Sequence, residues 1–388
     1  MAQTLPTVFQ TWFTEPEMLI TNDYIRPVTQ QIKDIGYYDD MDPKMRAGLD
    51  DSAGDLYGIP RDGYGMGMVL NLKTLAEYGI LPDEDGDGIG ELYDSDGNPL
   101  YAQTFDELAT WSELINERSG GLVKGSMFYS SNGNGGWLFS NLAWSYGAQL
   151  EIEQDGKWVG NLNSPEAVAA LTYIQDLAKD ELLPATTSVV YNDWYNKIGS
   201  QIATAFCGND VIQLAVTNGG MDLKDLAFVP MPAGPSGQYC LFGGTPFVFA
   251  KNATDEQVTG ALKFLEYMGR SPKVSDISHS GIEVGTRLAA QKNMPILPSI
   301  RPWINEDYKD MVNGIESQYI NVDMNKYQDF FDKFEDMRHD EEPYYPQEMY
   351  LILDQAIQAV LTDPNNSNPQ NLLNTANSQF NAQYMSKL

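Results

Sequence analysis

The chain has 388 residues, of which 42% are hydrophobic and 20% charged, a globular rather than disordered composition that is long enough for two lobes. Its formal net charge of −30 repels phosphates and anionic lipid, which argues against nucleic acid and membrane-surface partners. No apolar run reaches the roughly 18 residues that span a bilayer. The opening "MAQTLPTVFQTWF" lacks the charged and apolar regions of a secretory signal.

The first elements follow from apolar spacing and from proline and glycine. Residues 5–14 read as a short buried strand, and residues 23–38 as an amphipathic helical stretch that Pro27 interrupts. Small and apolar residues over 64–70 predict a strand that leads into a helix at 71–78, and Gly79 suits the end of that helix.

Capping signals define the helices that follow. Thr104 with Glu107 is a capping box, Ser164 before Pro165 is a second helix start, and residues 254–269 read as another capped helix. Residues 202–216 and 225–235 read as strands, and 241–253 as a strand broken by paired glycines. This mixed order predicts an α/β fold with helices packed on sheets. The two cysteines, Cys207 and Cys240, permit one disulfide or two buried thiols.

An acidic loop predicts a structural Ca²⁺ site. Counted from Asp83, oxygen ligands fall at positions 1, 3, 5, 9 and 12, with Gly88 at position 6, as in an EF-hand loop. A backbone carbonyl would serve at position 7, so the predicted ligands are Asp83, Asp85, Asp87, Ile89, Glu91 and Asp94. The alternative is a solvated acidic turn, but clustered carboxylates repel each other without a cation. Because no nucleophile or base motif lies beside it, the ion would stabilise the loop rather than catalyse.

Six stretches, taken in order, resemble the extracellular solute-binding proteins of bacterial ABC importers, in the carbohydrate-binding, maltose-binding-protein-like branch (family 1). They are residues 56–80, 104–115, 162–184, 225–237, 242–268 and 345–361. The resemblance implies a periplasmic-binding-protein-like, type II-like fold with two αβ lobes, a hinge and an interlobe cleft. Lobe 1 would comprise 1–64 and 246–308, and lobe 2 would comprise 65–245 and 309–388.

The same resemblance places the hinge. The chain would cross it near 62–66, 242–247 and 306–311, and the first two segments carry glycines that can absorb a backbone change or simply mark bulges. Family members usually begin with a strand–helix–strand unit that has no counterpart here. Lobe 1 is therefore expected to expose sheet edges and apolar surface.

Sugar recognition needs aromatic faces for stacking and planar polar groups for hydroxyls. Aromatic residues on loops are the best candidates: Trp12, Trp137, Trp194, Tyr195, Tyr344 and Tyr345. Polar candidates are Arg61, Asp62, Asn132, Asn134, Asp193, Asn218 and Gln347, with Gly243 and Gly244 where a ligand approaches the backbone. The resemblance supports the loops of Trp12 and Trp137 and the paired tyrosines, whereas Asn132 and Asn134 are equally explained as turn formers.

The resemblance implies a monomer that captures a carbohydrate, expected to be an oligosaccharide, and delivers it to ABC permease subunits. It also implies an extracellular location, as an anchored lipoprotein or in the periplasm. Alternatives are a binder of a non-sugar polar solute or peptide, a secreted glycoside-acting enzyme that needs only two carboxyls, and an adhesive protein stiffened by calcium. The absence of GxSxG, HExxH and P-loop motifs favours binding over catalysis.

Overall fold

In the computed structural model, which describes residues 5–51 and 53–388, the chain forms two compact units. Unit 1 comprises the described residues up to Tyr64 together with Phe242–Val322, and unit 2 comprises Gly65–Leu241 and Asp323–Leu388. The chain thus passes between units at 64/65, 241/242 and 322/323, whereas the boundaries predicted from the sequence are 64/65, 245/246 and 308/309.

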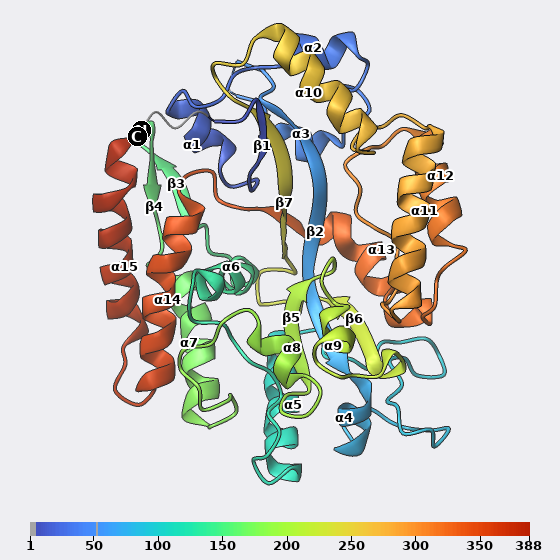
Figure 1. The fold of residues 1–388 in the computed structure, drawn as a ribbon. Coiled ribbons are helices and arrows are strands. Elements are labelled where there is room, and N and C mark those ends of the chain that lie inside the picture. The colour runs from blue at the N-terminus through green and yellow to red at the C-terminus, as the bar shows by residue number, and fades with distance from the viewer. Residues whose placement is uncertain (1–4, 52) are drawn as a thin grey trace. The chain divides into compact units, whose positions relative to one another are not determined.

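Unit 1 combines a small sheet with helices. Its elements are β1 (Val8–Gln10), α1 (Pro16–Thr21), α2 (Thr29–Asp34), α3 (Pro43–Ala47), the first half of β2 (Gly58–Asn71), most of β7 (Cys240–Phe249), α10 (Asp255–Tyr267), α11 (Asp276–Gln291) and α12 (Glu306–Glu316). Helices α11 and α12 lie side by side (Figure 1). The core is formed by residues such as Val28, Ile32 and Phe249, which are fully buried.

Unit 2 is larger and more helical. Its helices are α4 (Leu72–Glu77), α5 (Phe105–Arg118), α6 (Asn134–Ser145), α7 (Pro165–Lys179), α8 (Asp193–Lys197), α9 (Leu214–Thr217), α13 (Gln328–Met337), α14 (Pro346–Thr362) and α15 (Pro369–Gln383). Its further strands are β3 (Glu151–Gln154), β4 (Lys157–Gly160), β5 (Thr204–Gly208), β6 (Leu226–Pro230) and β8 (Arg338–Asp340). Helix α14 packs against both α6 and α15 (Figure 1).

One sheet connects strands that are distant in the sequence. Its order is β1-β7-β2-β5, with β6 also paired to β2 and β8 to β7. In unit 2 the second half of β2 is central, since Gly67 is opposite Cys207 of β5 and also opposite Pro230 of β6. The strand is buried along this half, as a central strand should be.

The predicted caps are confirmed. Thr104 and Glu107 form a capping box at α5, Ser164 accepts from Ala167 N at α7, and Thr254 with Gln257 forms a second box at α10. The mixed α/β prediction is confirmed as well. The predicted break in the strand over 241–253 is wrong, because β7 continues through both glycines.

Exposed apolar side chains lie on two helices of unit 1. On α10 and directly after it they include Phe264, Tyr267 and Met268, and on α11 Ile277, Val284 and Leu288. Cys207 and Cys240 are both buried and are not joined by a disulfide. Among the described residues, no helix is both long enough and apolar enough to cross a bilayer.

Candidate functional site

An aromatic cluster at the start of α6 is the strongest candidate in unit 2. Trp137 is half-buried and lies beside Tyr129, with ring centroids 6.5 Å apart, and edge-on to Tyr191 at 5.7 Å. Tyr129 is fully buried and its hydroxyl donates to the carbonyl of Phe206, so it holds the cluster against β5. The half-buried rings of Trp137 and Tyr191 can therefore present apolar area on a fixed base.

Two predicted polar residues organise the loops of this cluster. Asn134 Oδ1 accepts from Tyr191 N at 3.0 Å, and Asp193 Oδ2 accepts from Val190 N at 2.9 Å. Asn132 is exposed and has φ = 61°, the left-handed conformation of a turn former. The structure therefore brings Asn134, Trp137 and Asp193 together with Tyr191, which sequence reasoning missed although it lies in the same loop as Asp193.

The structure corrects the assignment of Trp194. Its side chain is fully buried in unit 2, so it offers no exposed face for stacking and belongs to the core. The neighbouring Tyr195 ring meets it edge-on at 5.6 Å and is half-buried. Trp194 lies within α8 and is buried there, whereas Tyr191 precedes the helix and is half-buried. Asn218, at the end of α9, is exposed, and its Oδ1 accepts from the Thr217 hydroxyl at 2.8 Å.

The paired tyrosines before α14 lie among other aromatic rings. Tyr344 is 5.6 Å from Trp158, and Tyr345 is 5.5 Å from Tyr384. Tyr345 has φ = 52°, a left-handed backbone directly before Pro346, which sets the start of α14. Both tyrosines and Gln347 are half-buried. Their role in ligand binding stays a prediction.

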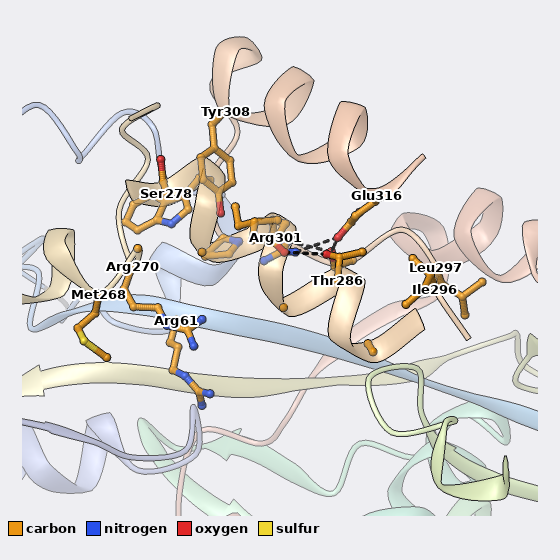
Figure 2. Close-up of a pocket in the computed structure, with 18 of the residues that line it drawn as sticks. Arg61, Met268, Arg270, Ser278, Thr286, Ile296, Leu297, Arg301, Tyr308 and Glu316 are labelled. Atoms are coloured by element: carbon orange, nitrogen blue, oxygen red, sulfur yellow. Dashed lines mark hydrogen bonds and ion pairs between the residues drawn. The ribbon is translucent and has the colours of Figure 1, made fainter. Parts of the chain in front are cut away.

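In unit 1 the predicted polar residues pair with each other. Asp62 accepts from the Thr245 backbone N at 3.0 Å and from its hydroxyl at 2.6 Å, and pairs with Arg61 at 3.1 Å. Arg61 also lines a pocket of unit 1 (Figure 2). Trp12 is 57% exposed, so it remains available to a ligand.

Close packing explains the two glycines of β7. A Cβ at Gly243 would lie 2.4 Å from the Tyr64 hydroxyl, and a Cβ at Gly244 would lie 2.4 Å from the carbonyl oxygen of Asp62. Any larger residue would collide with the adjacent strand. Glycine is therefore required here for strand packing, whether or not a ligand also approaches.

A pair of buried carboxyls lies beneath the tyrosine loop of unit 2. Burial, and then the charge of Glu342, raise the pKa of Glu151 to about 9, while burial raises the pKa of Glu342 to about 7. Glu342 accepts from Trp144 Nε1 at 2.8 Å, and His339 stacks on the Trp144 ring at 3.9 Å. Burial also lowers the pKa of His339. Glu151 and Glu342 are only 6% and 8% exposed, so they are poorly placed to reach a sugar bond.

The acidic loop brings three of its predicted ligands together. One carboxylate oxygen each of Asp83, Asp85 and Glu91 lie within 4.8 Å of one another. Glu91 Oε1 accepts from Glu84 N, while its buried Oε2 has no hydrogen-bond partner among the described residues. That spare oxygen fits a hard cation.

The predicted acidic ligands Asp87 and Asp94 lie outside this group. Asp87 Oδ1 accepts from the backbone N of Ile89 at 2.8 Å. Asp94 accepts from Asp96 N at 2.9 Å and Asn98 N at 2.8 Å, and so closes a turn of its own. The Asn98 side-chain amide also donates to Asp94 Oδ2, and this hydrogen bond, followed by the backbone ones, lowers the pKa of the Asp94 carboxyl. The structure thus gathers three of the predicted acidic ligands, and the full ligand set stays a prediction.

Solved structures show the fold to which the two units belong. The chain aligns with a Thermotoga lettingae solute-binding protein bound to α-D-tagatose at a TM-score of 0.69 and 17% identity, covering 97% of this chain and 85% of that one. Maltose-bound MalE3 of T. maritima aligns at a TM-score of 0.66 and 16% identity, and the alignment covers 98% of this chain and 85% of that one. UgpB of Mycobacterium tuberculosis, in complex with glycerophosphocholine, aligns at a TM-score of 0.67 and 13% identity. This alignment covers 98% of this chain and 84% of that one. These likenesses confirm the predicted periplasmic-binding-protein-like fold class.

The sequence itself identifies the family. No curated protein sequence matches the chain. The family model described as bacterial extracellular solute-binding protein matches residues 1–290, which is well over half of the chain. The predicted resemblance is confirmed, and the chain belongs to the bacterial extracellular solute-binding protein family.

Proposed function

We propose that the protein binds a carbohydrate and delivers it to the permease subunits of an ABC importer. The observation that carries this proposal is the half-buried Trp137 beside Tyr191 in a member of a solute-binding family. Structural relatives in complex with tagatose and with maltose support a sugar as the ligand class. The protein would act outside the cytoplasmic membrane, as a periplasmic protein or an anchored lipoprotein, and as a monomer.

Calorimetric titration with a panel of mono- and oligosaccharides tests the ligand class. Trp137→Ala removes a stacking face, so we expect at least a tenfold loss of affinity for the sugar that binds, about 1.4 kcal/mol. Trp111→Ala is the matched control, because Trp111 is also half-buried in unit 2 but lies on α5. Equal affinity of the Trp137 variant and the native protein would reject the cluster as the binding surface.

A second candidate is a polar solute other than a sugar. The observation that favours it is the likeness to UgpB, a relative in complex with glycerophosphocholine. Including glycerophosphocholine and short peptides in the panel separates the two candidates. Saturable binding of one of these, with no binding of any sugar, would replace carbohydrate as the ligand class.

We further propose that the bound ligand leaves chemically unchanged. The relatives are solute-binding proteins, and the buried position of Glu151 and Glu342 supports binding without cleavage. Prolonged incubation with each bound oligosaccharide, followed by chromatography, should return the intact sugar. Shorter sugars in molar excess over the protein would show that the protein is a glycoside-acting enzyme instead.

The acidic loop is proposed to hold a structural Ca²⁺ through Asp83, Asp85 and Glu91. The gathered oxygens and the unpartnered Glu91 Oε2 support it. Bound there, the ion would screen the repulsion between carboxylates and hold the long connection between α4 and α5 in one conformation.

A further inference from the structure

Unit 1 contains a pocket of about 430 Å³ whose lining comes entirely from that unit. It lies between α11, α12, the segment 295–303 and the turn after α10, and Arg61 of β2 reaches it from the sheet (Figure 2). This volume lies within the range of about 300–1,000 Å³ that is usual for small-molecule sites. Because the pocket is confined to unit 1, its ligand does not depend on the function proposed above.

Three arginines line this pocket in a strongly acidic chain. Arg301 pairs with Glu316 at 2.8 Å, as the dashed lines of Figure 2 show, and it donates to the Ser299 hydroxyl at 2.8 Å. Arg61 pairs with Asp62 at 3.1 Å and donates to the Thr245 hydroxyl at 3.2 Å. Two of the three positive charges are therefore neutralised by carboxylates.

Arg270 is the exception. It is half-buried, and its guanidinium makes no hydrogen bond or ion pair with any residue that the structure describes. Burial, and then the positive charge of Arg61, lower the pKa of Arg270, although the carboxylate of Asp62 acts in the opposite direction. A guanidinium stays charged at neutral pH all the same, so five N–H donors are held at the pocket without a protein acceptor. Burying such a charge is unfavourable unless an anion pairs with it.

The other lining residues indicate the chemical character of the rest of the ligand, beyond its anionic group. Met268, Ile282, Ile296 and Leu297 supply an apolar wall. One unpaired positive charge calls for a single negative charge, and a dianion would leave an excess negative charge near Glu316. The planar fork of a guanidinium matches the two oxygens of a carboxylate. We propose that this pocket binds a small organic monocarboxylate, with its carboxylate on Arg270 and its apolar body against the wall of Met268, Ile282 and Ile296.

Titration with benzoate, followed by calorimetry and by NMR line broadening of the ligand, tests the proposal. Native protein should bind benzoate saturably with one site per chain, whereas benzamide, its uncharged counterpart, should bind at least tenfold more weakly. Inorganic phosphate is the third probe and should not compete. Tighter binding of phosphate than of benzoate would overturn the monocarboxylate assignment, and equal binding of benzamide would overturn the role of the charge.

Arg270→Gln is the decisive variant, because it removes the unpaired charge and keeps a polar side chain. Benzoate affinity should fall at least about tenfold, as expected for a charge-assisted hydrogen-bonded pair. Arg287→Gln makes the same change in charge at an exposed position of α11 outside the lining and should leave affinity unchanged. Thermal unfolding of both variants verifies that they are folded. Equal losses in both variants, or no saturable binding by the native protein, would refute the site.

Discussion

At the scale of single residues, the buried carboxyls of unit 2 carry the clearest electrostatic consequence. Glu151 Oε1 and Glu342 Oε2 are buried without a hydrogen-bond partner among the described residues, and burial raises the pKa of Glu151 from 4.5 to about 9. The folded state therefore binds a proton that the unfolded state has released above pH 4.5. The contribution of the Glu151 proton to the stability of the folded state is therefore fully present below pH 4.5. It is lost as the pH rises toward 9.

Glu151→Gln should remove this pH dependence, because a neutral amide has no charge to bury. At pH 8 we expect the variant to be more stable than the native protein, by on the order of 2 kcal/mol, and near pH 5 the two should be alike. Thermal unfolding at both pH values measures the difference. Glu153→Gln, at an exposed position of the same strand, should change nothing. A difference between Glu151→Gln and the native protein that is equal at both pH values would contradict a buried proton.

At the scale of elements, the position of Trp137 depends on how closely α6 approaches α14. A Cβ at Gly136 would lie 2.3 Å from the Cα of Tyr350, so only glycine permits this packing. Asp354 of α14 also accepts from the backbone N of Gly133 at 2.6 Å and of Gly136 at 3.0 Å. One buried carboxyl thus satisfies donors at the start of α6, next to the aromatic cluster.

Gly136→Ala should destabilise unit 2, because backbone atoms of α14 cannot yield as a flexible side chain can. We expect a loss of about 1–3 kcal/mol or more in the free energy of unfolding. The control is Gly260→Ala within α10, where a Cβ would meet nothing within 4 Å. That change should stabilise by about 0.5–1 kcal/mol. Denaturant unfolding measures both, and a stable Gly136 variant would show that the two helices can separate.

The calcium proposal belongs to the same scale, since it concerns the connection between α4 and α5. Ca²⁺ at a hundredfold excess over its dissociation constant should stabilise the folded state by about 2.7 kcal/mol. A chelator should therefore lower the melting temperature, and Asp85→Ala should abolish the response. Asp96→Ala, in the exposed turn that follows, should preserve it. Identical melting curves with and without chelator in the native protein would exclude a stabilising ion.

At the scale of the whole molecule, three chain crossings join the two units. The sequence-based expectation that a ligand draws both lobes together stays a prediction. A ligand can shift such an equilibrium only by binding the closed form more tightly. Small-angle scattering should show a smaller radius of gyration when the bound sugar is present. An unchanged radius at saturation would favour binding by one unit alone, or a rigid surface protein.

Local sequence determined many of the elements of this protein. The capping boxes at Thr104 and Thr254 and the Ser164–Pro165 start all lie where spacing predicts them, because each cap is made within four residues of chain. The order of those elements was sufficient to recognise the family. The glycine-rich loop before α6 is sufficient to make Trp137 a candidate for stacking on a ligand, and that role stays a prediction.

Other features depended on residues that meet only after folding. Trp194 is fully buried while Tyr191, three positions earlier, stays half-exposed, and no local pattern distinguishes them. The Asp94 carboxylate accepts a hydrogen bond from the Asn98 side chain and does not join the cluster of Asp83. Arg270 lines the same pocket as Arg61, which belongs to a strand far away in the sequence. Spacing and caps are interactions along the chain, so sequence determines them. Burial and charge pairing are interactions across the chain, and only the tertiary structure decides them.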